Sequence, residues 1–184
     1  VGSLALTANT TAANNTAVGT EALYANTTGA NNVAVGVSAL DANTTGGQSI
    51  AVGASALTTN TTGDYNVGIG HQAAFYNTTG TEIIAVGHNA LLANTTGAYN
   101  VAVGGFALDA NTTASNNTAV GYASLGANTT GAQNTSLGYS ALSTTTTGTY
   151  NTGVGYNAQS GSATASSQFT LGDSNVAELR CNDQ

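Results

Sequence analysis

The sequence predicts an all-β fold, a parallel β-solenoid (a β-roll or β-helix) of stacked 17-residue turns. Three observations predict it. The motif (T/V/I)-A-V-G-x-x-A-L-x-A-N-T-T-G-x-x-N recurs without insertion from residue 16 to residue 168. Its period is too short for a helical repeat, which needs about 30 to 45 residues for two helices. Its β-branched residues and Thr-Thr-Gly triplets are also poor helix formers.

The period sets the expected dimensions and the division of the chain. Extended residues of about 3.3 Å each close a 17-residue circuit around only a thin core of side chains. Counting an incomplete first turn and a divergent last one, eleven turns at about 4.8 Å each predict a rod on the order of 50 Å long. We place the solenoid domain at residues 1–168 and a divergent terminal turn at residues 169–184.

Two positions of the turn, numbered from Thr16 as position one, are expected to form the core. Position three is a branched aliphatic residue, and position one shares its face because side chains alternate along a strand. Leucine at position eight supplies a second inward ridge, and each such burial contributes about 1.5–3 kcal/mol before entropy. The predicted core residues are Val18, Val35, Val52, Ile69, Val86, Val103, Val120, Leu23, Leu40, Leu57, Leu91, Leu108, Leu125 and Leu142.

Glycine and asparagine mark the expected corners. Gly recurs at position four of every turn, which predicts a positive φ or a very close backbone approach there. Asn at position eleven, followed by Thr-Thr-Gly, marks a second corner. Stacked amides and hydroxyls can pair from turn to turn at that corner, so these residues are expected to form ladders rather than an active site.

Position two carries only very small residues and is expected to form a homotrimer interface. It faces away from the predicted core, where solvent-facing residues would ordinarily be larger and more polar. Another copy of the chain is the simplest partner for such a regular stripe. Replacing Ala85 or Ala102 with Glu is then expected to break the trimer and leave the core pattern intact. The interface candidates are Ala17, Ala34, Ala51, Gly68, Ala85, Ala102 and Ala119.

Composition argues against several partners. The chain has one Lys or Arg, which is Arg180, against eight Asp or Glu, for a net charge of −7. It therefore lacks the cations on which nucleic-acid affinity depends. No apolar run of about 18 residues occurs, so direct membrane insertion is not expected. Cys181 is the single cysteine, which leaves no intrachain disulfide.

The repeat units NTAVG, NVAVG, NTSLG and NTGVG, each followed by an Ala-Leu or similar pair, carry a family resemblance over residues 1–168. They resemble the trimeric left-handed β-roll heads of bacterial autotransporter adhesins, and more closely the collagen-free shafts of bacteriophage tail fibres. The last turn, FTLGDSNVAELRCNDQ, is similar to the segment that leads into a self-cleaving intramolecular chaperone in phage fibres and tailspikes. The resemblance implies a homotrimer, with a chaperone domain that is missing or cleaved.

The ionisable residues do not predict catalysis, a metal site or a cofactor. Asp41 and Asp109 share position nine but lie four turns apart, about 19 Å, which is too far for a carboxylate pair within one chain. His71 and His88 share position five in adjacent turns and are expected to stack roughly 5 Å apart. A metal-binding pair is the alternative, but no acidic or cysteine partner shares their ladder nearby. We expect no enzymatic activity.

Aromatic residues are the candidates for receptor binding. Tyrosine occupies position five in three successive turns and position sixteen in three turns, and a phenylalanine lies at position six. A stripe of this kind can bind a sugar or a protein, or it can cover a seam between subunits. The candidates are Tyr122, Tyr139, Tyr156, Tyr65, Tyr99, Tyr150 and Phe106.

Three functions fit these features. The first is a rigid trimeric shaft of a phage tail fibre, located in the virion, whose partners are other fibre proteins and a host surface glycan or protein. The second is a trimeric adhesin head on a bacterial surface. The third is an ice-binding solenoid, suggested by Thr-Thr at the second corner. Adjacent threonines on one strand direct their hydroxyls apart, which disfavours the third.

Overall fold

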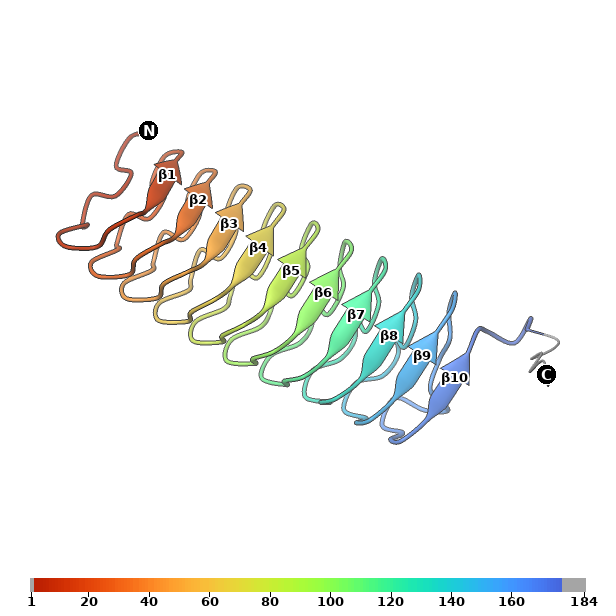
Figure 1. Ribbon diagram of the computed structural model, residues 1–184. Helices are drawn as coiled ribbons and strands as arrows, with labels where there is room; N and C mark the ends of the chain where they lie inside the picture. The colour runs from red at the N-terminus through yellow and green to blue at the C-terminus, as the bar shows by residue number, and fades with distance from the viewer. Residues whose placement is uncertain (1, 177–184) are drawn as a thin grey trace, which may run out of the picture.

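Ten strands of three residues each form one parallel sheet in the computed structural model, which describes residues 2–176 (Figure 1). They are β1 (Thr16–Val18), β2 (Val33–Val35), β3 (Ile50–Val52), β4 (Val67–Ile69), β5 (Ile84–Val86), β6 (Val101–Val103), β7 (Thr118–Val120), β8 (Thr135–Leu137), β9 (Thr152–Val154) and β10 (Phe169–Leu171). Each strand pairs with the next in sequence, as Thr16 does with Val33, 17 residues away. The predicted all-β solenoid and its period are confirmed.

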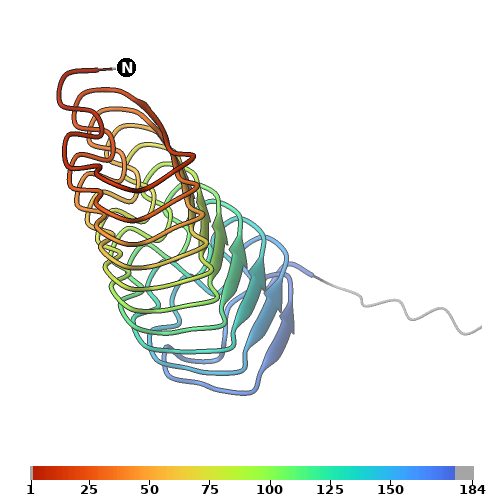
Figure 2. The same cartoon turned by 60° about the vertical axis from the view of Figure 1, so that its left-hand side comes forward.

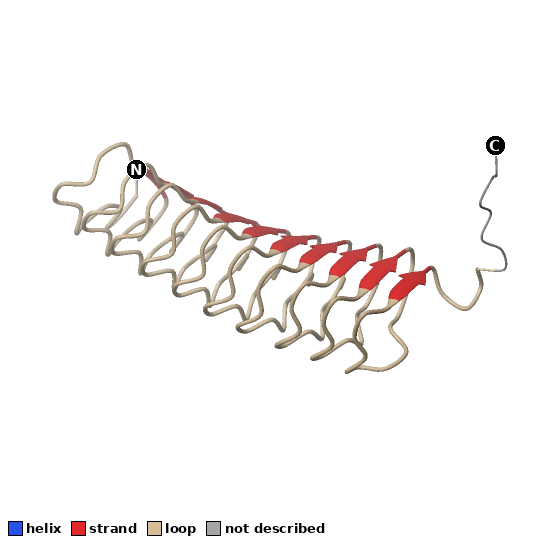
Figure 3. Cartoon of the chain, turned by 60° about the horizontal axis from the view of Figure 1, so that its bottom comes forward, coloured by secondary structure: helices blue, strands red, loops and turns tan. Residues whose placement is uncertain are grey.

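The strands occupy positions one to three of each turn, and the other positions form turns and loops. All the strands lie along one side of the solenoid, with loops on the remaining sides (Figure 3). Viewed closer to the axis, successive turns nest on one another around a shared interior (Figure 2). The molecule is therefore a rod with one flat β-sheet side.

The orientation of the strands is the reverse of the predicted one. Position two is buried, and positions one and three face outward, as the burial patterns of β1 and β2 show. The predicted core residues Val18, Val52 and Ile69 are 37–45% exposed. Val35, Val86, Val103 and Val120 are half-buried on the same outward side. The small residues predicted to form an interface instead line the chain's own core: Ala17, Ala34, Ala51, Gly68, Ala85, Ala102 and Ala119.

Leucine from the opposite wall explains why only small residues fit at position two. A Cβ added to Gly68 would lie 3.0 Å from Leu57 Cγ, and one added to Gly153 would lie 2.7 Å from Leu142 Cγ. The leucine side chains thus cross the thin interior and reach the inner face of the sheet. A valine inside the strand would overfill this space, which makes the larger aliphatic residues the outward ones.

The position-eight leucines are core residues, as predicted. Leu23, Leu40, Leu57, Leu91, Leu108, Leu125 and Leu142 are all 0% exposed. They adopt left-handed backbone conformations, with φ between 49° and 55°. Such a φ is unusual for a bulky residue and costs about 1–2 kcal/mol. Burial of the side chain, about 1.5–3 kcal/mol, offsets that strain.

Glycine at position four meets both predicted requirements. In the nine turns that begin with strands β1 to β9, the φ of this glycine lies between 117° and 140°. A Cβ at Gly104, for example, would lie 2.5 Å from the carbonyl oxygen of Gly121 in the next turn. The backbones of successive turns therefore approach too closely at this corner for any side chain.

The predicted asparagine ladder runs through the interior at position eleven. Asn43 Nδ2 donates to Asn26 Oδ1 at 2.8 Å and also to the Gly46 carbonyl at 2.9 Å. The pattern repeats from Asn26 to Asn128. Each buried amide thus bonds within its own turn and to the preceding turn, which ties the turns together along the axis.

Threonine at position twelve forms a second ladder. Its hydroxyl donates to the carbonyl of the same position in the next turn, as Thr44 Oγ1 does to Thr61 at 3.0 Å. Asparagine at position seventeen adds a third, in which its Oδ1 accepts from the backbone N–H one turn on, as Asn117 does from Asn134 at 2.9 Å. Side chains thereby complete the bonding of backbone groups that the three-residue strands leave unpaired.

The sheet extends into the terminal segment. β10 pairs in parallel with β9, with Phe169 opposite Thr152. Arg180, Cys181 and the rest of the predicted chaperone lead-in beyond residue 176 lie outside the described residues, as does Val1. Within residues 2–176 there is no helix of the length and hydropathy that would cross a bilayer.

Candidate functional site

The sheet side of the rod presents a surface of mainly aliphatic and threonine side chains. We define the outer sheet face as the first and third residues of β1–β10. Ile50 and Ile84 at position one are each 40% exposed, and Leu137 at position three is 50% exposed. The face carries Val, Ile, Leu, Thr and Phe, and no ionisable residue. A parallel sheet in most proteins is covered on both faces, whereas this sheet leaves its outer face exposed.

A column of rings borders this face at position five. We call it the aromatic ladder: His71, His88, Phe106, Tyr122, Tyr139 and Tyr156. His71 and His88 stack with centroids 5.5 Å apart and planes 11° apart, close to the predicted spacing. Tyr122 and Tyr139, and then Tyr139 and Tyr156, stack at 5.4 Å with planes 13° and 12° apart.

Phe106 joins the two halves of the ladder from position six. Its ring lies edge-on to His88 at 5.0 Å and to Tyr122 at 5.7 Å. Position five of this turn is Gly105, which has no side chain to occupy the column. The phenylalanine ring therefore fills a gap that glycine leaves, and the column runs unbroken over six turns. Sequence position alone placed Phe106 near the stripe but not within it.

Stacking determines what the ladder can bind. Both faces of the Tyr139 ring are covered by neighbouring tyrosines. A sugar ring cannot stack on a covered face, so the exposed part of the Tyr139 side chain is the ring edge with its hydroxyl group. Tyr122, Tyr139 and Tyr156 are 50–63% exposed. The three tyrosines of the ladder offer a row of hydrogen-bonding hydroxyls on an apolar support.

The other predicted tyrosines border the opposite side of the outer sheet face. Tyr65, Tyr99 and Tyr150 at position sixteen are 53–58% exposed and lie in non-adjacent turns. Tyr65, Val67, Glu82 and Ile84 line a shallow groove of about 440 Å³ between position sixteen and position one. The structure thus brings all seven receptor-binding candidates to the two borders of one face.

The threonines that suggested ice binding are not equivalent. The position-twelve hydroxyls donate to the carbonyls of the next turn, as in Thr78 to Thr95 at 2.9 Å. Only position thirteen, such as Thr96, is an exposed row. A single row differs from the paired rows of a flat ice-binding surface.

The ionisable groups are dispersed. Burial raises the pKa of the Asp41 carboxyl above its ordinary value, and the nearby Glu21 raises it further. Burial also raises the pKa of Asp109, against hydrogen bonds from backbone amides that lower it. Across residues 2–176, no group of three or more His, Cys, Asp or Glu side chains is placed to hold a metal ion.

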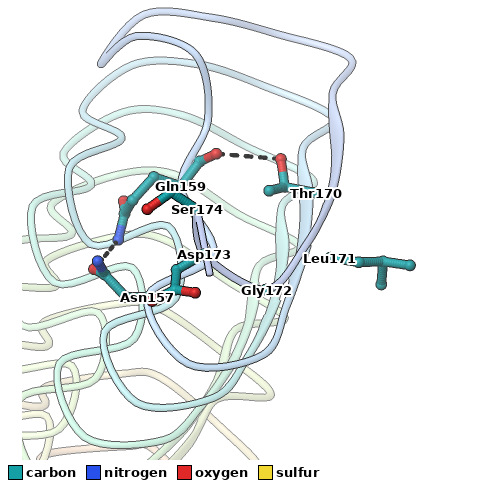
Figure 4. Close-up of a pocket in the computed structure, with 7 residues that line it drawn as sticks. All are labelled: Asn157, Gln159, Thr170, Leu171, Gly172, Asp173 and Ser174. Atoms are coloured by element: carbon teal, nitrogen blue, oxygen red, sulfur yellow. Dashed lines mark hydrogen bonds between the residues drawn. The ribbon is translucent and has the colours of Figure 1, made fainter. Parts of the chain in front are cut away.

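A polar hollow of about 380 Å³ lies at the C-terminal end of the stack (Figure 4). Gln159 Nε2 donates to Asn157 Oδ1 at 3.0 Å, and Thr170 Oγ1 donates to the Gln159 carbonyl at 3.2 Å. Leu171 points away from the other labelled residues, and Asp173 is the ionisable side chain of the lining. The bond from Thr170 ties the last described turn to the one before it, and the bond between Gln159 and Asn157 lies within that preceding turn.

Comparison of the chain with protein families, curated proteins and solved structures finds no match.

Proposed function

We propose that this chain is a structural and attachment protein without enzymatic activity. It forms a stretch of a rigid homotrimeric shaft of the kind found in phage tail fibres. The shaft holds a receptor-binding tip away from the virion, or contributes to binding the host-surface glycan or protein itself. Other fibre proteins would join it at its ends.

The unbroken in-register stack is the observation that carries this proposal. Ten strands pair with partners 17 residues apart, and three side-chain ladders run parallel to the axis. Each turn contacts only its neighbours, so length is added turn by turn without changing the cross-section. Such a design suits a spacer that must transmit position and force over a distance.

The mass of the assembly tests the shaft. Light scattering on the intact 184-residue chain is expected to give three chain masses in native buffer. Boiling in detergent before gel analysis is expected to leave a trimer band. A monomer at micromolar concentration in native buffer would exclude a self-assembled shaft.

The ladder hydroxyls supply the test of attachment. Tyr139→Phe keeps the ring stack and removes one exposed hydroxyl, so it is expected to weaken binding to an array of bacterial surface glycans while the trimer persists. Tyr24→Phe is the matched control, because Tyr24 is 42% exposed and belongs to no ring pair of the ladder. Equal binding by the two variants would show that the ladder does not contact the glycan.

A further inference from the structure

We infer that the outer sheet face is the surface through which copies of this chain associate, with their axes parallel and their turns in register. The inference rests on the proposed shaft and assigns its interface, which the buried position-two residues cannot form. Ala34, Ala85 and Ala102 are 0% exposed within one chain, so a second copy has no access to them.

The size and chemistry of the face suit a protein interface. Ten strands at about 4.8 Å spacing and three residues of about 3.3 Å make it about 48 Å long and about 10 Å wide. With the borders from position sixteen to position five, the surface reaches about 1,100 Å². A threefold arrangement divides this surface between two neighbours, about 550 Å² toward each, so each interface buries about 1,100 Å² in total, just above the roughly 1,000 Å² that a specific interface needs. An aliphatic centre bordered by tyrosines also matches the usual division into apolar core and polar rim.

Regularity indicates that the partner is the same chain. The first and third residues of ten strands form two ridges that repeat at the strand spacing over the whole rod. A partner that covers them must offer the same period over the same length, and a second copy of this solenoid does so. Parallel association in register also places each residue near its own copies, where an ionisable group would meet like charge. The two ridges carry none.

A threefold arrangement uses both ridges and both borders. With the outer sheet face directed toward the axis, the position-one ridge contacts one neighbour and the position-three ridge contacts the other. The groove formed by Tyr65, Val67, Glu82 and Ile84 then opens toward the first neighbour. The aromatic ladder borders the seam with the second, so the tyrosines cover the seams and leave their outer edges accessible.

Paired glutamate variants test the face. Ile84→Glu introduces a charge at the centre of the face, and Thr96→Glu introduces the same charge in the same turn on the exposed position-thirteen row. We expect Ile84→Glu to reduce the assembly to single chains that keep their β-sheet circular dichroism, a threefold loss of mass. Thr96→Glu is expected to keep the wild-type mass.

The outcomes separate the two proposals. A wild-type monomer contradicts the shaft and this interface together. A wild-type trimer that Ile84→Glu does not dissociate contradicts the interface alone. If Ile84→Glu does not fold, Ile84→Ser takes its place. Ile84→Ser is expected to make the trimer dissociate at a higher protein concentration than the wild type does. The same dissociation on dilution as the wild type would overturn the inference.

Thiol crosslinking tests the parallel register. In a Cys181→Ser background, Val18→Cys and Val154→Cys place a thiol near either end of the face. Each variant is expected to crosslink to itself with a short bismaleimide. Crosslinking only when the two variants are mixed would show antiparallel chains and overturn the parallel register.

Discussion

Single residues in this fold are constrained by the turn above and the turn below more than by their own preferences. Positions six, eight and sixteen adopt positive φ in residues as different as Phe106, Leu108 and Asn116. Asparagine adopts that conformation readily, but phenylalanine and leucine do not favour it, so the sequence gives no consistent signal for it. Position four is different, because only glycine fits there, and its recurrence did predict the corner.

The adjacent glycines 104 and 105 give a matched test of that constraint. Gly104→Ala places a Cβ 2.5 Å from the Gly121 carbonyl at a φ of 131° and is expected to cost more than roughly 1–3 kcal/mol of unfolding free energy. A Cβ at Gly105 would make only ordinary contacts, with the Tyr122 ring at 3.5 Å and the His88 carbonyl oxygen at 3.8 Å, so Gly105→Ala is expected to stabilise by about 0.4–1 kcal/mol. Chemical denaturation measures both, and equal effects would contradict the close stacking of turns at position four.

The end of the asparagine ladder offers a stabilising substitution. Asn128 Oδ1 is buried without a partner, because position eleven of the next turn is Thr145. Thr145→Asn is expected to donate to Asn128 Oδ1 and raise the unfolding free energy by about 1 kcal/mol. Thr145→Val, which only removes the hydroxyl bonded to Ser160 at 2.8 Å, is the control and is expected to destabilise. A Thr145→Asn variant no more stable than wild type would contradict the ladder.

Two half-buried aspartates predict an unusual dependence of stability on pH. The folded chain raises the pKa of Asp41 and Asp109 above 3.8, so it binds their protons more tightly than the unfolded chain does. Their contribution to unfolding free energy is therefore largest at acid pH and is lost as pH rises from about 3.8 through the raised values. The double variant Asp41→Asn/Asp109→Asn is expected to show a smaller change in thermal midpoint between pH 4 and pH 7. An unchanged pH profile would contradict this assignment.

At the scale of the strand, the sequence determines the alternation but not which side is the inside. The alternation of side chains along a strand correctly places positions one and three on one face of the sheet and position two on the other. Hydrophobicity alone then favours valine inside, whereas the thin interior admits only alanine, glycine or serine opposite the leucines. The width of the interior depends on the path by which each turn closes, and this path cannot be read from the repeat sequence. The leucine core and the asparagine corner could be predicted without knowing the width of the interior.

Neighbouring residues of β6 test the orientation of the strand. Ala102→Glu puts a carboxylate into a site that is 0% exposed, and is expected to cost more than about 2 kcal/mol of unfolding free energy. It should damage the fold itself rather than only the association of chains. Val103→Glu, on the outward side, is expected to keep the fold. Circular dichroism through thermal unfolding distinguishes them, and a stable Ala102→Glu chain would contradict the orientation.

The whole molecule combines a repeat that can extend indefinitely with one side that is left uncovered. Interior hydrogen-bond ladders make each turn dependent on its neighbours, and the outer sheet face offers the same surface along the rod. The period and the parallel stacking followed from the sequence, because both are properties of the repeat. The borders of the face did not, since the place of Phe106 in the aromatic ladder depends on the gap at Gly105.

Mass per unit length, measured by small-angle X-ray scattering on the intact chain, tests the central claim most directly. One solenoid contributes 17 residues for each turn, and each turn rises about 4.8 Å. A parallel trimeric shaft predicts three times the mass per length of one solenoid, over a rod on the order of 50 Å. The mass per length of a single solenoid would contradict the account.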